Sequence, residues 1–322
     1  IKNFYENCDI VIIKASSLTK ICNITENELK LLFSIEKPVV KVTIDDPILI
    51  GLTGKNFMRV KVYDDSFQDF DDYVFEQDEN NIEVIQVKDN ISVIKNKKFP
   101  ENLDNLDSNQ LFNRFLNIKN EANFEGAIGI NFDTTNISFL HTKGSETKEI
   151  IAFQKFEFCH TFDAIRDKNS KLYKNFAMKF PDIIKNLESY NDLDFFSTIS
   201  LVLDLDQFSF EALSDKSCEF RGNGGMKLDT YFNEEGFDYR SFIVSVMVFV
   251  LAESRKSHIA YSVFESLADM GIYVSNQLSN KLGTNNFVVM GNIFSNNIFY
   301  GRILTEFSTS KPFFSKMYAL AQ

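Results

Sequence analysis

Hydrophobic residues along the first hundred positions fall into short runs separated by polar segments. Runs rich in β-branched residues predict strands at 9–14, 39–44, 57–63, 82–87 and 91–94. Ser16 and Ser17 are expected to cap a short helix that ends at Ile21. Alternating strands and helices predict an α/β domain over residues 1–100.

A second helix is predicted at 26–34 from its start signal and its periodicity. Thr25 and Glu28 have the spacing of a capping box, in which each side chain bonds the backbone of the other residue. Leu29, Leu32 and Phe33 recur at helical spacing and are expected to share one buried face. The polar segment 95–108 is then the best candidate for a linker.

Residues 101–322 form the second predicted domain, and its pattern changes along the chain. A helix at 111–122 precedes three β-type runs at 126–132, 137–142 and 149–158, joined by connections short enough for hairpins. Helices are predicted at 162–187, at 242–252, through the apolar positions from Ala260 to Leu278, at 295–307 and at 312–322. An apolar strand at 287–290 ends at Gly291. This order suggests half of an actin/hexokinase-like (ribonuclease H-like) fold, in which phosphates lie at strand-to-helix turns.

Charge and composition exclude several classes of function. The net charge of −11 argues against nucleic acid or an anionic membrane as the main partner. The longest apolar run, at 242–252, is far shorter than the roughly 20 residues of a membrane-spanning helix. The first residues lack the features of a signal peptide, so a cytoplasmic location without a transmembrane segment is expected.

Cysteine and histidine do not indicate a metal site. The four cysteines contain no CxxC pair, and the three histidines share no HxxxH or HxH spacing. Reduced, buried thiols are expected, with no metal-ligating residues.

The first domain resembles the YrdC-like domain of the HypF carbamoyltransferases, which help to build the cyanide ligands of NiFe hydrogenase. The stretch DIVIIKASSLTKICNITENELKLLFSIEKPVVKV is similar to a family segment that ends LLTS-x-x-RPIVLL. The matching positions are Leu31, Leu32, Ser34, Lys37, Pro38 and Val39. The run ENNIEVIQVKDNISVI is similar to RPIVRRVDDSVVR through Asp89 and Ser92. No counterpart of the nucleotide-binding TSAN-type loop is found.

The second domain is similar to the carboxyl-terminal part of the same family. GINFDTTN resembles GxAFDGTGxG, FRGNGGMKLD resembles YEGEAAIxLE, VVMGNIFSNN resembles LSGGVFQNR, and PFFSKMYALAQ lies where the family has PPNDGGxxLGQ. The acylphosphatase domain, zinc fingers and HHAH segment of the family have no counterpart. The resemblance implies a vestigial nucleotide or carbamoyl site, whose residues are Asp133, Thr135, Gly222, Gly224, Gly291, Asn292 and Asn296.

The departures from the family pattern fall on the expected ligands. Other side chains replace the family's glycines, a serine or its charged groups at Thr134, Asn136, Leu201, Arg221, Met290, Asn292, Ser315, Lys316 and Met317. Losing one group that offsets charge on phosphate or carbonyl oxygen typically costs about 3 to 4 kcal/mol of transition-state stabilisation. The resemblance therefore implies a pseudoenzyme with an actin/hexokinase-type (ASKHA) scaffold and no catalytic residues.

Each remaining signal also has a simpler structural interpretation. Asp133 fits a turn between strands, where aspartate accepts hydrogen bonds from backbone amides. Gly222, Gly224 and Gly225 could cradle a phosphate, but no Lys-Ser/Thr pair follows them. His160, with Asp163 and Arg166 after it, could form an acid/base cluster, but a surface loop leading into a helix is the simpler interpretation. The acidic run at 64–72 is either a solvated surface or a docking patch for a basic partner.

The sequence thus predicts a non-catalytic, HypF-related accessory protein in the maturation or assembly of NiFe hydrogenase, acting through protein binding. Its expected partner is a hydrogenase subunit or another maturation protein, and no cofactor is expected. One alternative is an active nucleotide-dependent carbamoyltransferase of the HypF type, which would retain ATP and magnesium at Asp133, Gly291 and Asn296. A second alternative is an interaction module with no link to hydrogenase.

Overall fold

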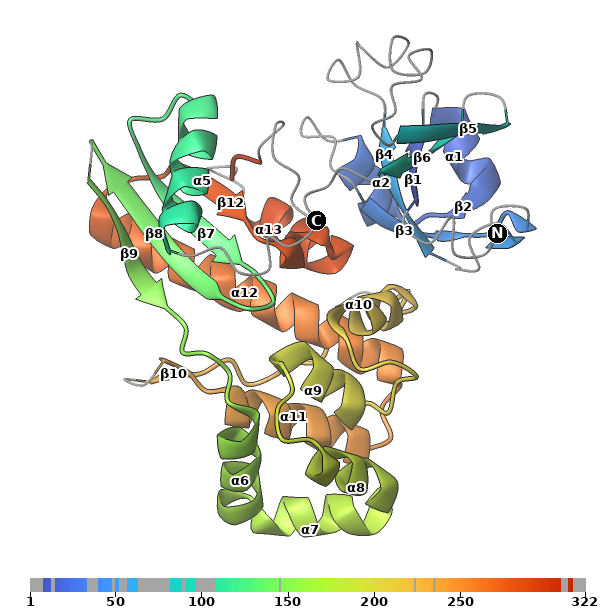
Figure 1. Cartoon of the computed structure of the whole chain (residues 1–322), viewed down its shortest axis with the longest axis vertical. Coiled ribbons are helices and arrows are strands. Elements are labelled where there is room, and N and C mark those ends of the chain that lie inside the picture. The colour runs from blue at the N-terminus through green and yellow to red at the C-terminus, as the bar shows by residue number, and fades with distance from the viewer. Residues whose placement is uncertain are drawn as a thin grey trace. The chain divides into compact units, whose positions relative to one another are not determined.

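A computed structural model describes most of the chain. The described residues are 8–12, 15–33, 40–47, 50–51, 57–62, 82–88, 91–96, 108–144, 146–222, 224–233, 236–307 and 312–314. The chain divides into two compact units (Figure 1), one of residues 1–103, 295–297 and 316–322, and one of residues 104–294 and 298–315. None of the described helices is long and apolar enough to cross a membrane.

The first unit contains a six-stranded sheet with the order β2-β3-β4-β1-β6-β5. Its strands are β1 (Cys8–Ile12), β2 (Cys22–Asn23), β3 (Val40–Ile44), β4 (Phe57–Val62), β5 (Ile82–Lys88) and β6 (Ile91–Asn96). Strand β1 is parallel to β4 and antiparallel to β6. Val40, Val42 and Val60 are almost fully buried, as expected for apolar strands. The strands predicted in this part of the sequence are confirmed, and the YrdC-like assignment of the unit stays a prediction.

Two short helices accompany this sheet, α1 (Ala15–Ile21) and α2 (Glu26–Leu32). The predicted capping box of α2 is confirmed: the Thr25 amide donates to Glu28 Oε2 at 2.7 Å, and the Glu28 amide donates to Thr25 Oγ1 at 3.2 Å. The predicted caps of α1 are wrong. Ser16 and Ser17 lie inside the helix because it already begins at Ala15, the residue type with the highest helix propensity.

The predicted buried face of α2 is only partly correct. Leu32 is fully buried, whereas Leu29 is 38% exposed and Phe33 is 43% exposed. Leu29 and Phe33 are four residues apart and lie on the same side of the helix as neighbours of Leu32, but both stay partly exposed.

The second unit contains a four-stranded sheet with the order β12-β7-β8-β9. Its strands are β7 (Gly126–Phe132), β8 (Ile137–Lys143), β9 (Glu146–Ala152) and β12 (Phe287–Met290). Strands β7, β8 and β9 are antiparallel neighbours, as predicted, and β12 is parallel to β7. A parallel bridge between Val288 and Phe313 lies on the other edge of β12. Pro312–Phe314, at the start of the predicted final helix, is not helical, and residues 315–322 lie outside the described part.

The predicted third strand is displaced along the sequence. It begins at Glu146 instead of Glu149 and ends at Ala152 instead of Phe158. Residues 153–157 leave the sheet, and Phe158 begins a helix. Phe153 stacks on Phe237 with ring centroids 5.4 Å apart, so this aromatic packing replaces continued strand pairing.

Helices cover both faces of the second sheet (Figure 1). Helix α5 (Ser108–Glu121) lies on one face, where Leu111, Phe115 and Ile118 are buried together with Leu140 and Val288. Helix α12 (Lys256–Leu282) lies on the other face. The six apolar positions predicted for this long helix are all buried, which confirms it: Ala260, Phe264, Leu267, Gly271, Val274 and Leu278.

The remaining helices of this unit form a layer beyond the sheet (Figure 1). They are α6 (Phe158–Lys168), α7 (Ser170–Lys179), α8 (Pro181–Ser189), α9 (Phe195–Val202), α10 (Phe210–Cys218) and α11 (Tyr239–Leu251). The helical region predicted at 162–187 is thus three helices, and the helix predicted at 242–252 is α11. A two-stranded ribbon, β10 (Phe232–Asn233) and β11 (Gly236–Phe237), precedes α11. After β12, a 3-10 helix (Asn292–Ser295) and α13 (Asn297–Glu306) replace the single helix predicted at 295–307.

Candidate functional site

The candidate site lies where two parallel strands of the second unit end. Strand β7 ends at Phe132 and strand β12 ends at Met290, which is the register partner of Asn131. The turn 133–136 follows β7, and Gly291 follows β12. Because carboxyl ends of parallel strands meet at one edge of a sheet, the fold brings Asp133, Thr135, Gly291 and Asn292 together.

Gly291 is required by the close approach of these two strands. Its φ of +105° is a backbone conformation that residues with a side chain rarely adopt. A Cβ atom at this position would lie 2.1 Å from the carbonyl oxygen of Phe132 and 2.9 Å from the amide nitrogen of Asp133. The glycine therefore has a structural reason that does not depend on any ligand.

Asn292 connects the end of β12 to the turn after β7. The Thr134 amide donates to Asn292 Oδ1 at 2.9 Å, and Asn292 Nδ2 donates to Thr134 Oγ1 at 3.0 Å. The Asn292 amide donates to Asp133 Oδ2 at 3.4 Å. The Asn292 side chain thus accepts the hydrogen bond of the Thr134 backbone amide.

Asp133 is used inside the same turn. Its Oδ1 atom accepts from the Thr135 amide at 3.1 Å and from Thr135 Oγ1 at 2.9 Å. The Asn292 amide also donates to Asp133. Asp133 therefore makes the hydrogen bonds to neighbouring backbone amides that aspartate commonly makes in turns. The amides of Thr134, Thr135 and Asn292 therefore all have acceptors within the protein.

A small cavity of about 30 Å³ adjoins the turn. This volume accommodates about one or two water molecules, whereas ligand pockets typically measure about 300 to 1,000 Å³. Polar turn residues and aromatic side chains line the cavity, with no lysine or arginine: Asp133, Thr134, Thr135, Asn136, Ile137, Phe153, Gln154, Phe156, Phe195, Phe196 and Tyr239. The described residues at this turn do not fit a nucleotide.

The aromatic side chains that fill this region were not predicted from the sequence. Tyr239 packs against Phe195 at 5.0 Å and against Phe156 at 5.2 Å between ring centroids. Its hydroxyl donates to the carbonyl oxygen of Gln154 at 3.1 Å, and burial raises its pKa. The sequence offered one signal for this cluster, the unusual total of 34 phenylalanines.

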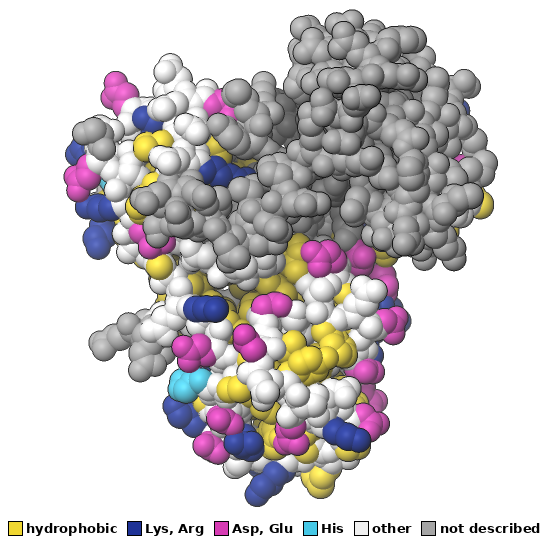
Figure 2. Space-filling view, in the orientation of Figure 1, with side chains coloured by type: hydrophobic (Ala, Val, Ile, Leu, Met, Phe, Trp, Pro, Cys, Tyr) yellow, Lys and Arg dark blue, Asp and Glu magenta, His cyan; other side chains and the backbone are white. Residues whose placement is uncertain are grey.

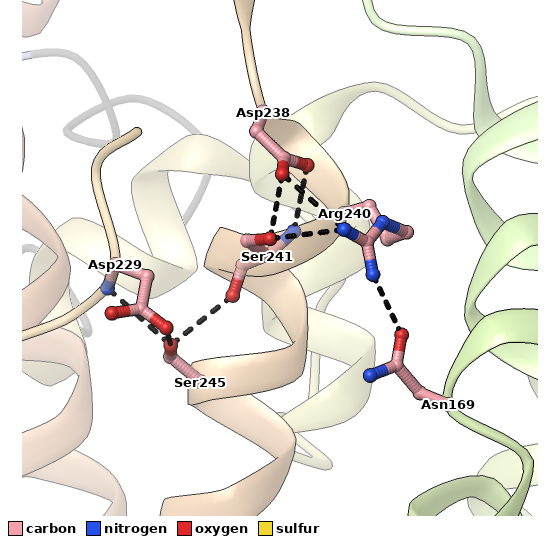
Figure 3. A network of polar contacts seen from close by, with 6 residues as sticks. All are labelled: Asn169, Asp229, Asp238, Arg240, Ser241 and Ser245. Carbon is pink, nitrogen blue, oxygen red and sulfur yellow. Dashed lines mark hydrogen bonds and ion pairs between the residues drawn. The ribbon is translucent and has the colours of Figure 1, made fainter. Parts of the chain in front are cut away.

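A polar network fixes the helix that carries Tyr239 (Figure 3). Asp238 caps α11, because the Ser241 amide donates to its Oδ1 at 3.0 Å and Ser241 Oγ donates to its Oδ2 at 2.6 Å. Arg240 reaches Asp238 at 3.4 Å and donates to Asn169 Oδ1 at 2.9 Å. Burial alone would raise the pKa of Asp238, but the Ser241 hydrogen bonds and the Arg240 charge lower it.

The glycine-rich turn 221–227 packs elsewhere on the unit. The Gly225 amide donates to Glu265 Oε2 at 2.7 Å, and the Met226 amide donates to Ser262 Oγ at 2.8 Å. Both acceptors are on α12. These two amides are therefore not available to a phosphate.

The remaining predicted site residues do not complete a ligand site. A Cβ atom on Gly222 would lie 2.3 Å from the Phe220 ring, and Gly224 has a φ of +91°. The turn that contains them packs at Ser262 and Glu265, whereas Gly271, about 9 Å further along α12, contacts Phe132. Asn296 is fully buried and already interacts with other groups of the protein.

Metal ligands are not gathered in the described part of the chain. Its histidine, cysteine, aspartate and glutamate side chains form no group of three that could hold an ion. Ser315, Lys316 and Met317, which the resemblance aligned with a metal-binding segment, lie outside the described residues, as does the side chain of Ser92. His160 and Cys159 are exposed at the start of α6.

Comparisons with known proteins identify the fold. No family model matches the chain, and no curated protein sequence does. Full-length HypF in its phosphate- and nucleotide-bound crystal form is similar over 99% of this chain and 78% of its own, with 12% identity and a TM-score of 0.60. The crystal structure of T. kodakarensis HypF is similar over 99% of this chain and 65% of its own, with 12% identity and a TM-score of 0.54. The chain therefore has a HypF-like α/β fold.

Proposed function

We propose that this chain is a non-catalytic, HypF-related accessory protein that acts by binding a partner during the maturation or assembly of NiFe hydrogenase. The HypF-like fold supports the family connection. The observation that carries the non-catalytic part is the cavity of about 30 Å³ beside Asp133, with aromatic side chains packed around it. The partner is a hydrogenase subunit or another maturation protein.

The contacts at the turn supply the physical reason. Transfer of a phosphoryl or carbamoyl group requires hydrogen-bond donors or cations directed at developing negative charge. Here the amides of Thr134, Thr135 and Asn292 already bond to side-chain oxygens. Among the residues that line the cavity, none is cationic. A nucleotide would have to displace both these bonds and the aromatic packing of Tyr239.

The alternative function is an active, nucleotide-dependent carbamoyltransferase of the HypF type. The retained geometry of Asp133 beside Gly291 at the ends of parallel strands favours it, because such ends are a common place for phosphate. This function would require residual ATP and magnesium binding at the turn. It would also require movement of Phe156, Phe195 or Tyr239.

Calorimetric titration of the purified chain with ATP and magnesium distinguishes these functions. We expect no saturable heat for the wild-type chain and none for Asp133→Ala. Micromolar binding that Asp133→Ala abolishes would support the carbamoyltransferase, especially if carbamoyl phosphate is also turned over. Binding that Asp133→Ala leaves unchanged would indicate a nucleotide held elsewhere.

The hydrogenase connection needs a separate experiment. Tagged chain expressed in its native cells is expected to co-purify with a hydrogenase subunit or a maturation protein, identified by mass spectrometry. A matched tagged protein of similar net charge serves as the control for acidic background binding. Recovery of partners unrelated to hydrogenase in repeated experiments would favour a general interaction module.

A further inference from the structure

Helix α7 presents an outer face that no other described part of the protein covers. Lys171, Lys174, Asn175 and Met178 have the i, i+3, i+4, i+7 spacing of one helix face, and all four are exposed. Met178 is 76% exposed. An open groove of about 610 Å³ along this side is lined, among the described residues, by α7. These four residues are called the α7 outer face.

The opposite side of α7 is held firmly. Phe176 is fully buried and packs on Phe180 with ring centroids 5.0 Å apart. Tyr173 donates to Glu188 Oε1 of α8 at 2.7 Å, and burial together with this bond raises the pKa of Tyr173 to about 12. Lys179 Nζ lies 2.7 Å from Glu253 and donates to the Leu251 carbonyl at 3.0 Å. The outer face is therefore presented in one fixed orientation.

The charge of this region is opposite to that of the whole chain. Residues 164–180 contain five lysines and arginines and one aspartate, although the chain carries a net charge of −11. Cations at either end of the region are paired, Arg166 with Asp163 and Lys179 with Glu253. Among the described residues, Lys171 and Lys174 have no ion-pair or hydrogen-bond partner. Figure 2 shows basic side chains, with acidic side chains between them, at the lower edge of this view.

We propose that the α7 outer face docks an acidic, amphipathic segment of a partner protein. Lys171 and Lys174 supply complementary charge, and Met178 supplies a flexible apolar contact that adapts to different side chains. A short acidic segment meets only this basic face, whereas a long nucleic acid would also meet the acidic remainder of the surface. This inference rests on the proposed binding function and names the surface that performs it.

Fluorescence anisotropy with the full chain and a defined peptide tests the proposal. The probe is a labelled synthetic peptide of about 14 residues, in which leucines at helical spacing are separated by glutamates. We expect saturable binding that weakens as salt is raised. Lys171→Glu with Lys174→Glu should weaken it about tenfold or more, because both complementary charges become repulsive. Met178→Ser should cause a smaller loss without changing the salt dependence.

Lys185→Glu on α8 is the matched control, because it makes the same charge change at another exposed lysine. It should alter peptide affinity by less than about twofold, and circular dichroism should show that every variant is folded. Absence of wild-type binding, an equal loss in the control, or tighter binding of a single-stranded oligonucleotide of equal charge would overturn the proposal. The assay contains no hydrogenase protein, so its failure is distinguishable from failure of the co-purification experiment.

Discussion

The two glycine-containing turns of the second unit, at Gly291 and at 222–225, differ in what surrounds the glycine. At Gly291 a neighbouring strand lies too close for a side chain, and the obstacle is the Phe132 backbone. At Gly225 the obstacles are mainly side-chain atoms of Ser262 and Glu265, which also accept amide hydrogen bonds. The first turn is therefore dictated by the sheet, whereas the second depends on side chains of α12.

In both turns, backbone amides that could bind a phosphate instead donate hydrogen bonds within the protein. In each turn amides are directed at oxygens, but the oxygens belong to the protein: Asn292 and Asp133 in one, Glu265 and Ser262 in the other. A glycine pattern alone cannot distinguish a ligand site from such internal pairing.

The largest effect is expected from Gly291→Ala. Its methyl group would collide with the Phe132 carbonyl in a backbone conformation that is already unfavourable for alanine. We expect the free energy of unfolding, measured in urea, to fall by about 3 kcal/mol or more. Gly224→Ala is the matched control, because it has positive φ with nothing within 4 Å of the added Cβ, and should lose only about 1 to 2 kcal/mol. Equal losses of unfolding free energy in the two variants would show that the steric clash with Phe132 contributes nothing.

The next largest effect is expected in the second turn from Glu265→Ala. The Gly225 amide loses a charged acceptor at 2.7 Å, so the free energy of unfolding should fall by about 2 kcal/mol. Glu265→Gln keeps an acceptor oxygen and should retain about half of this stabilisation. If both variants are as stable as the wild type in urea unfolding, this amide is not held by Glu265 in solution.

Asn292→Ala should have a somewhat smaller effect on the first turn. It removes both side-chain hydrogen bonds to Thr134 but keeps the backbone contact with Asp133, so the loss should be about 1 to 2 kcal/mol. Asn292→Asp, which keeps the acceptor for the Thr134 amide, should lose less. Calorimetry with inorganic phosphate should still show no binding to Asn292→Ala, and a clear binding heat would mean that Asn292 alone closes the site.

The smallest effect is expected from Asp238→Ala, and it depends on pH. Loss of the α11 cap should cost about 1 kcal/mol at pH 7. Because folding lowers the pKa of Asp238, its contribution is complete above the unfolded pKa of about 3.9 and declines as pH falls through the lower folded value. Unfolding in urea at pH 7 and near pH 3 should therefore show the difference between variant and wild type shrinking in acid. If the difference in unfolding free energy between variant and wild type is the same at both pH values, the ionised Asp238 carboxylate does not supply this stabilisation.

Local patterns predicted much of the second unit. The six apolar positions of α12 and the strands β7, β8 and β12 follow from periodicity and composition, since helices and strands bury one face or a whole run. Asp133 and Gly291 were grouped only through the resemblance, and the parallel pairing of β12 with β7 is what brings them together.

The rest depends on contacts between distant residues. Asn292 bonds Thr134 across 158 positions, and Phe153 stacks on Phe237, which lies 84 residues later. No local pattern shows which partner a side chain will find at such distances, so the aromatic packing beside Asp133 was missed. For the same reason, the acceptors on α12 for the glycine-rich turn could not be recognised.

Helix α12 links the two turns mechanically. Its 27 residues extend about 40 Å, with Glu265 holding the glycine-rich turn and Gly271 touching the strand that leads into Asp133. The buried positions of α12 pack against the sheet on one side and against neighbouring helices on the other. The middle of α12 therefore cannot unfold without separating the sheet from these helices. Its central amide hydrogens should therefore exchange with solvent only when the whole unit unfolds, which makes them reporters of global opening.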